Sequence, residues 1–446
     1  MPSAPVVITV EARVKDSLML RVVVIGLIVV GLLVPIMMIG FLVSEREHRR
    51  NEATGEIESM WSAPQLVSGP VLSVPYRCGP PLGPNVLTEC NSRAHLQART
   101  LTVEGVLEPE IRTRSVFRAV VYRARLKVRA VFAPDLAAWS PAPTEVFWDR
   151  ASVNVGLSDP RGVVRISELL SGETRTKFAP GIAQMPGYAL GFPTGMHAPA
   201  GVARPGPDGT YAVSFDFDLN GTRQIEFAML GDEATVRLSS SWPHPSFIGG
   251  ALPTTRTSTT EGFTAEWRTG AFWRAATAAG TGAAGVGNTF GVSLITPVDI
   301  YRQTDRAVKY AVLFIGATFL VAFLWEVTRG VLVHPVQYAF VGFSICVFYM
   351  LLLSGSEHAG FDPAYVVASA ATVLLLSWYW RWVAGNRAQG GMMAVILSGM
   401  YGYLYLLLRL EDYALLAGSV GLFIALMLVM YLTRRVNWYR LGTTRQ

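Results

Sequence analysis

Two short stretches of the sequence carry side chains that could do acid–base or metal chemistry. His244 stands between two prolines, with Trp242 and Phe247 on either side, and Glu357 and His358 are neighbours much later in the chain. Two histidines and one carboxylate are the ligands of a common catalytic zinc site, and the same groups can act as general acid and base. The spacing contains no His-Glu-x-x-His or other compact metal signature, so this chemistry requires folding to bring the two stretches together.

The same residues also have a simpler interpretation. Aromatic side chains favour the membrane–water interface, and flanking prolines hold His244 in a stiff, extended segment. Trp242, Phe247 and the prolines would then fix an external domain against the bilayer. Under either interpretation the candidate functional cluster comprises Trp242, His244, Phe247, Glu357 and His358.

No other pattern in the sequence indicates an enzyme. It contains no phosphate-binding Gly-x-x-x-x-Gly-Lys-Ser/Thr, no dinucleotide fingerprint and no Gly-x-Ser-x-Gly elbow, so we assign no catalytic residue, no cofactor and no metal. Tyr401, Tyr403 and Tyr405 could line a path, but they accompany Gly399 and Gly402, and small residues usually indicate close helix packing. The apolar runs also carry almost no ionisable residue at mid-depth, where coupling sites normally lie.

Two cysteines, Cys78 and Cys90, bracket a loop rich in proline and glycine. In an oxidising compartment they would form a disulfide that closes a loop of about a dozen residues and stabilises the fold by about 2–3 kcal/mol. The alternative is two unpaired thiols. The third cysteine, Cys346, lies within an apolar run and is expected to be a small buried side chain.

These residues are positioned by long apolar runs at both ends of the chain. A helix of about 20 apolar residues crosses about 30 Å of hydrocarbon. The first run covers residues 22–43 and reads as an uncleaved anchor, continued by a polar helical stalk over residues 44–59. Five more runs follow in the last third of the chain, at residues 307–327, 333–354, 364–383, 391–409 and 414–432.

The short connections between these runs predict the orientation in the membrane, because Lys and Arg favour the cytoplasmic side. The loops at residues 355–363 and 410–413 carry no basic residue, with Arg409 at one margin, whereas ten basic residues lie on the other side. Both termini are therefore expected in the cytoplasm and the large domain outside. The ten are Arg13, Lys15, Arg21, Arg329, Arg381, Arg387, Arg434, Arg435, Arg440 and Arg445.

Polar residues at one end of the spans allow two interpretations. Glu326, Arg329 and His334 could form a polar knot around the tight turn between the second and third spans. Ordinary helix capping and snorkelling of long side chains at span ends is the alternative.

The segment between the first and second spans alternates as strands do. In residues 122–130 small or apolar residues alternate with basic ones, which predicts one buried and one cationic face. Asn220-Gly221 separates two strand-like runs and predicts a hairpin. We expect a mainly antiparallel domain of two packed sheets. Its cationic face could attract anionic lipid or polymer, or be simply solvated.

The predicted fold is therefore an α+β membrane protein. Six transmembrane helices, one N-terminal and five C-terminal, flank a large antiparallel β-rich periplasmic domain. The chain is 51% hydrophobic and 16% charged, and its net charge of +6 is concentrated beside the spans, so nucleic-acid binding is not expected. The domains are a cytoplasmic tail (1–21), the first span (22–43), the periplasmic domain (44–306) and the five-helix domain with its cytoplasmic tail (307–446).

Several stretches resemble the CreD family of bacterial inner-membrane proteins, in order and spacing over nearly the whole chain. Residues 77–95, which include the cysteine pair, match poorly, so the resemblance adds nothing to the disulfide. The matching stretches are Leu66–Tyr76, Ser240–Pro253 (SSWPHPSFIGGALP), Glu261–Trp267 (EGFTAEW), Asp299–Tyr310, His334–Tyr338 and Ser356–Phe361.

The resemblance implies a protein of the bacterial cytoplasmic membrane with a periplasmic domain and a role in cell-envelope integrity under stress. It supplies no catalytic residue and no substrate. Our leading interpretation is a non-enzymatic protein, anchored in the lipid bilayer, whose β domain binds a periplasmic protein, a lipid or a cell-wall component. The alternatives are a membrane-embedded enzyme acting on lipid or cell-wall intermediates, and a transporter or lipid-transfer protein with a lipid-sized cavity.

Overall fold

The computed structural model describes eleven stretches of the chain: residues 18–78, 91–139, 142–183, 194–200, 205–206, 209–228, 231–270, 289–294, 300–329, 333–410 and 413–434. They form two compact units. The helical unit contains residues up to Arg50 and from Val298 onward, and the β unit contains Asn51–Pro297. Each unit is described by itself below.

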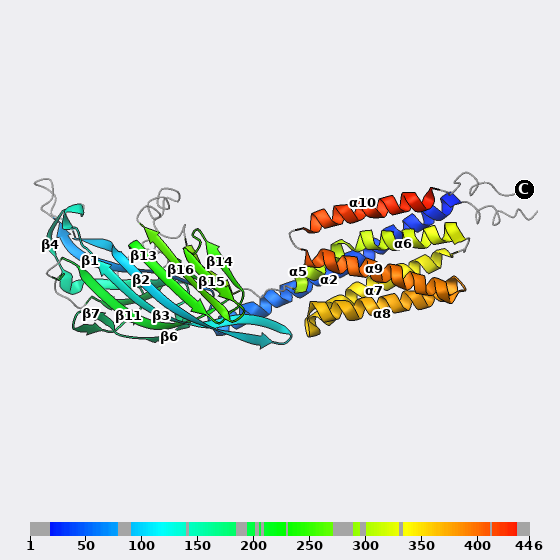
Figure 1. Ribbon diagram of the computed structural model, residues 1–446. Coiled ribbons are helices and arrows are strands. Elements are labelled where there is room, and N and C mark those ends of the chain that lie inside the picture. The colour runs from blue at the N-terminus through cyan, green and yellow to red at the C-terminus, as the bar shows by residue number, and fades with distance from the viewer. Residues whose placement is uncertain are drawn as a thin grey trace, which may run out of the picture. The chain divides into compact units, whose positions relative to one another are not determined.

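Seven α-helices are described, and six of them are long and apolar enough to cross a membrane, as the sequence predicts. Their order along the chain is visible in Figure 1. The additional helix, α5, is a short amphipathic one that precedes the second span, and its last three residues lie within the predicted span 307–327. The helices are α2 (Leu18–Met60), α5 (Ile300–Lys309), α6 (Ala311–Arg329), α7 (Pro335–Ala359), α8 (Phe361–Val383), α9 (Arg387–Arg409) and α10 (Ala414–Thr433).

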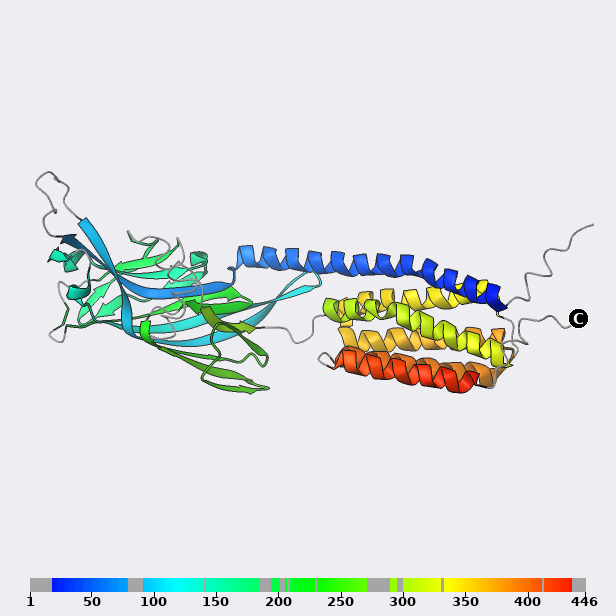
Figure 2. The ribbon, with the colours of Figure 1, turned by 90° about the horizontal axis from the view of Figure 1, so that it is seen from above.

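The first span and the predicted stalk are one continuous helix. Helix α2 runs for 43 residues with Pro35 inside it, as Figure 2 shows. Its first part packs in the helical unit, where Leu32 lies so close to Gly342 that a Cβ there would sit 2.1 Å from the leucine Cδ1. Its residues from Asn51 onward belong to the β unit. The prediction of a helical stalk over residues 44–59 is therefore confirmed.

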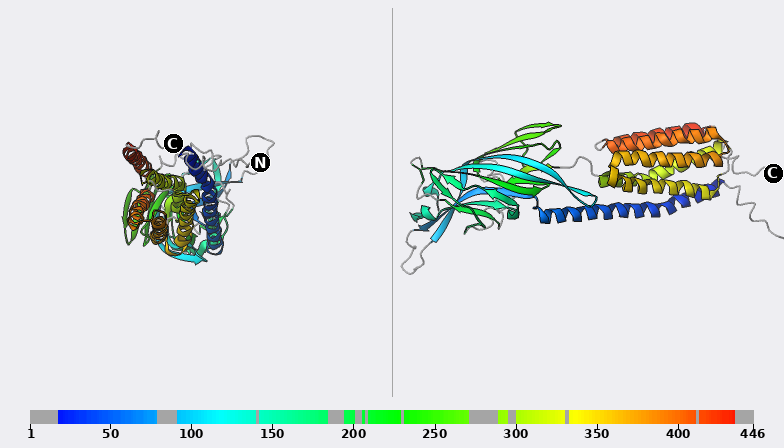
Figure 3. Two further views of the ribbon diagram at one scale, coloured as in Figure 1. Left: turned by 90° about the vertical axis from the view of Figure 1, so that its right-hand side faces the viewer. Right: turned by 90° about the horizontal axis from the view of Figure 1, so that it is seen from below.

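The other five spans lie alongside one another (Figure 3). Contacts within the helical unit define its two ends. At what we call the Glu326 end, α2 begins with Arg21 paired to Glu326 of α6, and α7 begins with Tyr338 bonded to the same carboxylate. At the Glu357 end, α7 finishes with Glu357, α8 begins, and α9 finishes with Arg409.

The β unit contains the remaining elements, and its strands fall into two sheets joined by β2. The strands are β1 (Gln65–Cys78), β2 (Asn91–Arg114), β3 (Phe117–Phe132), β4 (Pro143–Val146), β5 (Ser152–Leu157), β6 (Val163–Ile166), β7 (Leu169–Ser171), β8 (Thr174–Thr176), β9 (Ala179–Pro180), β10 (Gly195–Pro199), β11 (Tyr211–Thr222), β12 (Gln224–Ala228), β13 (Gly231–Ser240), β14 (Pro245–Gly249), β15 (Thr255–Thr259), β16 (Gly262–Gly270) and β17 (Thr289–Leu294), with short 3-10 helices at Leu136–Ala138, Trp148–Arg150 and Pro160–Gly162.

The pairing of the strands confirms two mainly antiparallel sheets. In the first sheet the order is β9, β10, β5, β1, β12, β17, β14, with β4 and the start of β2 also on β1. In the second it is β8, β7, β11, β3, β2, β13, β16, β15, with β6 also on β11. Two pairings are parallel, β1 with β12 and β2 with β13.

The predicted hairpin at Asn220-Gly221 is wrong. Both residues lie inside β11, which pairs with β3, whereas β12 pairs with β1 and β17. The chain passes from one sheet to the other at Arg223, whose φ is 60°. Glycine is needed at 221 for another reason: a Cβ there would lie 2.2 Å from the hydroxyl oxygen of Tyr122. That hydroxyl donates to the Gln224 carbonyl at 2.7 Å and ties the corner down.

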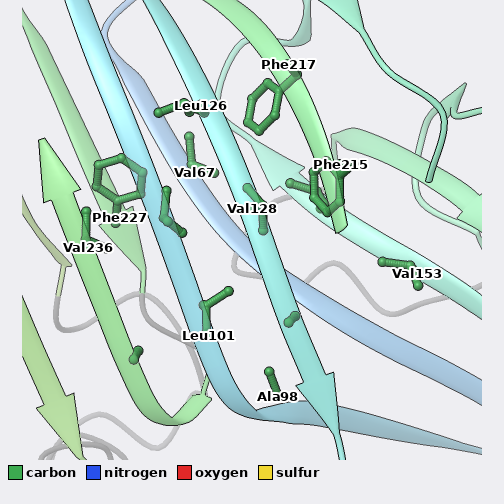
Figure 4. Packing of buried hydrophobic residues seen from close by; sticks show 14 of the residues in the cluster. Val67, Ala98, Leu101, Leu126, Val128, Val153, Phe215, Phe217, Phe227 and Val236 are labelled. Atoms are coloured by element: carbon green, nitrogen blue, oxygen red, sulfur yellow. The ribbon is translucent and has the colours of Figure 1, made fainter. Parts of the chain in front are cut away.

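The inner faces of the two sheets form one hydrophobic core. Figure 4 shows Leu126 and Val128 of β3, Phe215 of the neighbouring strand β11 in the same sheet, and Phe227 of β12 in the other sheet, all at most 4% exposed. A cavity among these residues has a volume of only about 10 Å³, close to the space of one water molecule. This cavity is too small for an acyl chain and gives no support to a lipid-transfer function.

The cationic face of β3 is present as predicted, but its charge is balanced. Arg123, Arg125, Lys127 and Arg129 are all exposed, while the residues between them are buried. The neighbouring strands place carboxylates beside them: Glu104 and Glu108 on β2, Asp216 and Asp218 on β11. The solvated interpretation therefore fits better than attraction of an anionic polymer.

A buried polar joint connects the end of α2 to both sheets. The Asp159 carboxylate, 7% exposed, accepts from the Ala63 amide (3.0 Å), the Ser62 hydroxyl (3.2 Å) and the Arg161 guanidinium (2.8 Å from each of two nitrogens). Gln65 donates to Ser62 (2.7 Å) and to the Asp159 carbonyl (2.9 Å). These bonds fasten the start of β1 where the helix ends, and they lower the pKa of Asp159 to about 2, with the Arg161 hydrogen bonds as the largest cause.

Candidate functional site

Glu357 belongs to a polar cluster at the Glu357 end of the helical unit. Its side chain is only 9% exposed, and its Oε1 accepts a hydrogen bond from the Tyr301 hydroxyl at 3.0 Å. The Arg46 guanidinium of α2 lies 3.8 Å from the same oxygen, and the Arg50 guanidinium lies over the Tyr301 ring at 5.2 Å. Three helices, α2, α5 and α7, are thereby joined through one carboxylate.

The electrostatics of this cluster keep Tyr301 a hydrogen-bond donor. Burial is the largest cause that raises the pKa of Tyr301, and the hydrogen bond to the Glu357 carboxylate adds to it. A tyrosine is protonated at neutral pH even with its ordinary pKa of 10.0, and the raised pKa keeps the Tyr301 phenol a donor to Glu357 at higher pH as well. The Tyr301 hydrogen bond and the Arg46 guanidinium therefore fix the position of the Glu357 side chain.

A second polar group lies beside the first at the same end. Arg409 of α9 contacts the Asp362 carboxylate of α8 at 2.5 Å, and the Tyr405 hydroxyl donates to the same carboxylate at 3.1 Å. Arg409 also donates to the Tyr405 hydroxyl at 3.0 Å. The Arg409 and Asp362 side chains are each about half exposed, so their ion pair adds little to the stability of the helical unit. Its main effect is to hold the end of α9 beside the start of α8.

The candidate histidines lie in separate units. His244 is exposed on the segment before β14 in the β unit, and His358 is exposed next to Glu357 in the helical unit. Across the stretches that the structure describes, no three His, Cys, Asp or Glu residues are close enough to hold a metal ion. A joint site of His244, Glu357 and His358 therefore stays a prediction.

The two aromatic candidates have packing partners inside the β unit. Phe247 of β14 is half-buried, with its ring centroid 6.0 Å from that of Phe263 and 5.7 Å from that of Trp267. Trp242 is also half-buried and packs against the hydrophobic core. The Trp267 indole donates to the Ala251 carbonyl at 3.2 Å, which fixes the loop after β14. Two of the family-like stretches thus form one packed body.

At the opposite end of the helical unit, the predicted polar knot has different members. Glu326 is 6% exposed and binds Arg21 (2.7 Å) and the Tyr338 hydroxyl (2.9 Å). His334 caps α7: its Nδ1 accepts from the Val336 amide at 3.3 Å, and the Gln337 side chain completes a capping box. The capping interpretation of His334 is therefore confirmed.

An open groove of about 450 Å³ lies at the outer face of the second sheet. Ser239, Thr264 and Thr257 stand in one cross-strand row on β13, β16 and β15, with Val106 of β2 continuing it. The neighbouring row is charged, whereas this one is not. The groove is lined by Val106, Ser239, Ser240, Ser241, Thr257, Thr259, Glu261, Gly262, Phe263 and Thr264.

The predicted disulfide joins one described cysteine to one that lies outside the described residues. Cys78 ends β1 and is buried, but Cys90 lies outside the described residues. The Cys78–Cys90 bond stays a prediction. Cys346 is a free, buried thiol in α7, as its position in an apolar run indicates.

Sequence reasoning found Glu357 and missed its partners. Arg46 and Tyr301 are far from Glu357 in the chain, yet all three flank apolar runs on the side where the loops lack basic residues. That shared position is the signal that could have grouped them. The tyrosines of α9 were noticed, but the expected close packing at Gly399 and Gly402 is wrong, because a Cβ at either would meet no atom within 4 Å.

These features define a class: a multi-span membrane protein with a two-sheet β unit inserted between its first and second spans. A family model described as "Inner membrane protein CreD" matches residues 17–439. The Inner membrane protein CreD of Escherichia coli (strain K12) is 30% identical over 421 residues, covering 92% of this chain and 91% of that protein. The chain belongs to the CreD family, and it is a multi-pass inner-membrane protein.

Comparison with solved structures adds no functional argument. Two structures of an M1 zinc metallopeptidase from Deinococcus radiodurans, one a mutant with bound substrate, align at 11% identity with a TM-score of 0.19. They cover 73% and 76% of this chain, and 93% and 90% of their own. Similarity at this level supports neither a shared fold nor a shared activity.

Proposed function

We propose that this protein supports the integrity of the bacterial cell envelope by binding an envelope component through a β unit on the periplasmic side. The two termini are in the cytoplasm, and the helical unit serves as anchor. The observation that carries the proposal is the charge difference between the two ends of the helical unit, taken with membership of the CreD family.

The difference in charge between the two ends is set by the residues at the helix ends and in the short loops. Arg21, Arg381 and Arg387 stand where α2 begins, α8 ends and α9 begins, which is the Glu326 end. At the Glu357 end, by contrast, the last turn of α7 carries Glu357 and the first turn of α8 carries Asp362. Apart from Arg409 at the end of α9, the basic residues near that end flank the long β unit, and long segments are translocated largely regardless of their charge. The Glu326 end is thus the cytoplasmic one.

Cysteine labelling tests this orientation directly. In a background without native cysteines, Ser115→Cys in the exposed β2–β3 turn should react with a membrane-impermeant maleimide on intact spheroplasts. Asn386→Cys in the α8–α9 turn should react only after the membrane is permeabilised. The reverse pattern would place the β unit in the cytoplasm and refute the proposal.

The groove on the second sheet is the proposed binding surface. Its volume of about 450 Å³ lies within the range of ligand sites in proteins. Its hydroxyl row offers hydrogen bonds without charge, and Glu261 is the one charged residue among the described residues of its lining, so the groove suits a polar envelope component without negative charge. The open, solvent-facing form also allows a polymer or a protein segment to lie across the sheet.

Complementation of an envelope-stress phenotype in a deletion strain tests the groove. Thr264→Arg places a long charged side chain across the hydroxyl row and should abolish rescue at normal membrane abundance. Thr235→Arg is the matched control, because Thr235 lies on the same strand as Ser239 but outside the groove. Equal rescue by the two variants would exclude the groove as the binding surface.

A further inference from the structure

The interior of the helical unit brings polar side chains of three spans to one depth. Counting 1.5 Å per residue from the Glu357 end, Tyr349 of α7 lies about 15 Å deep, Thr372 of α8 about 16 Å and Tyr401 of α9 about 12 Å. All three are at most 4% exposed. They therefore lie near the middle of the hydrocarbon layer, where hydrogen-bonding groups need a partner.

Two of these hydroxyls lack such a partner. Within the described part of the chain, no group hydrogen-bonds to the hydroxyl of Tyr349 or of Tyr401. The Tyr401 hydroxyl faces Thr372, but the Thr372 hydroxyl already donates its proton to the Ala368 carbonyl at 2.9 Å, so Thr372 can only accept and no group in the described residues donates to the Tyr401 oxygen. Leaving a buried hydroxyl unbonded costs about 1–3 kcal/mol judged from protein variants, so an occupant that can donate and accept would stabilise both.

The surrounding rings prevent Tyr401 from turning its hydroxyl elsewhere. Its ring centroid lies 4.7 Å from that of Phe314 and 4.8 Å from that of Phe348. A series of tyrosines connects this point to the Glu357 end. Tyr365 donates to the Tyr401 carbonyl at 2.7 Å, and its ring lies 5.2 Å from that of Tyr405, which bonds to Asp362.

We propose that Tyr349, Thr372 and Tyr401 bind water at mid-depth, and that this water enters from the Glu357 end along Tyr405 and Tyr365. Water fits because the hydroxyl groups at the site are uncharged and can both donate and accept hydrogen bonds. The site makes the bundle interior hydrated without an ionisable group, which distinguishes it from an ion-coupling site. It is independent of the β unit and of the function proposed above.

Cys346 provides a reporter, because it lies one helical turn from Tyr349 on the same face of α7 and within electrostatic reach of it. The full chain is transferred into heavy water in lipid nanodiscs, and the S–H stretch is followed by infrared spectroscopy. The difference from Cys346→Ser assigns the band. A hydrated site predicts exchange of the Cys346 S–H within minutes, before the protein unfolds.

Two variants complete the test through thermal unfolding. Tyr349→Phe and Tyr401→Phe each remove a hydroxyl that the water uses, so the Tm should fall by roughly 2–4 °C. Tyr431→Phe, on the exposed face of α10, is the matched control and should leave Tm unchanged. Exchange together with a lower Tm in either variant supports the site. Protection of the Cys346 S–H from exchange over hours overturns the proposal, and so does a Tm that is unchanged in both variants. If neither variant folds, the exchange in the wild-type chain decides.

Discussion

Replacing Asp159 by asparagine should destabilise the β unit more than any exposed acidic substitution, because it breaks the polar joint at the end of α2. The asparagine keeps one oxygen as an acceptor, but its NH2 group replaces the other oxygen. One of the two hydrogen bonds from the Arg161 guanidinium is then lost. The pKa of Asp159 falls from 3.8 to about 2 in the folded protein. At 1.36 kcal/mol per pH unit, this difference corresponds to roughly 2.5 kcal/mol of stability at neutral pH.

The direction of the pH dependence follows from the lowered pKa. An acid whose pKa is lower in the folded state stabilises the fold above its unfolded value, and that contribution is lost as the pH falls toward the folded value. The wild type and Asp159→Asn should therefore differ by about 5–10 °C in Tm at pH 7. The gap should narrow between pH 4 and pH 2.

Differential scanning calorimetry of the full chain in detergent measures both quantities. Asp149→Asn is the control, because Asp149 is exposed and its pair with Arg150 is loose at 3.8 Å. Equal Tm values for Asp159→Asn and the wild type at pH 7 would refute the reasoning. A gap that stays constant down to pH 2 would show that the variant acts through packing and not through charge.

Three further substitutions test other parts of the structure by thermal unfolding. Glu326→Gln removes a buried carboxylate from its ion pair and should cost the helical unit roughly 2–3 kcal/mol, seen as a lower Tm. Gly221→Ala drives a methyl into the Tyr122 hydroxyl and should cost roughly 1–3 kcal/mol, whereas Gly270→Ala, which meets no atom, should be neutral. Phe247→Ala should lower stability by about 2 kcal/mol even in detergent, because its ring packs within the β unit; an effect seen only in lipid would support the interfacial interpretation instead.

Much of the fold could be predicted because its strongest signals are local. Run length alone located the six spans, and strict alternation located β3 with its buried and charged faces. The corner at Arg223 could not be found in this way. Asn220-Gly221 has the composition of a hairpin turn, yet its glycine is required by Tyr122, a residue about a hundred positions earlier whose place only the folded sheets determine.

In the helical unit, too, local sequence signals predict some features of the polar sites, whereas contacts between distant residues could not be predicted. Helical periodicity separates the three tyrosines of α9: Tyr401 and Tyr405 are one turn apart and share a face, while Tyr403 points elsewhere and donates to the Ala417 carbonyl of α10 at 2.5 Å. That periodicity could have marked the inward pair from the sequence alone. Periodicity could not identify the residues that pack against Tyr401, because these come from three other helices, α6, α7 and α8. A polar residue in a membrane helix becomes a site only through the helices that pack around it, so sequence reasoning identifies the candidates and the packing decides which of them meet.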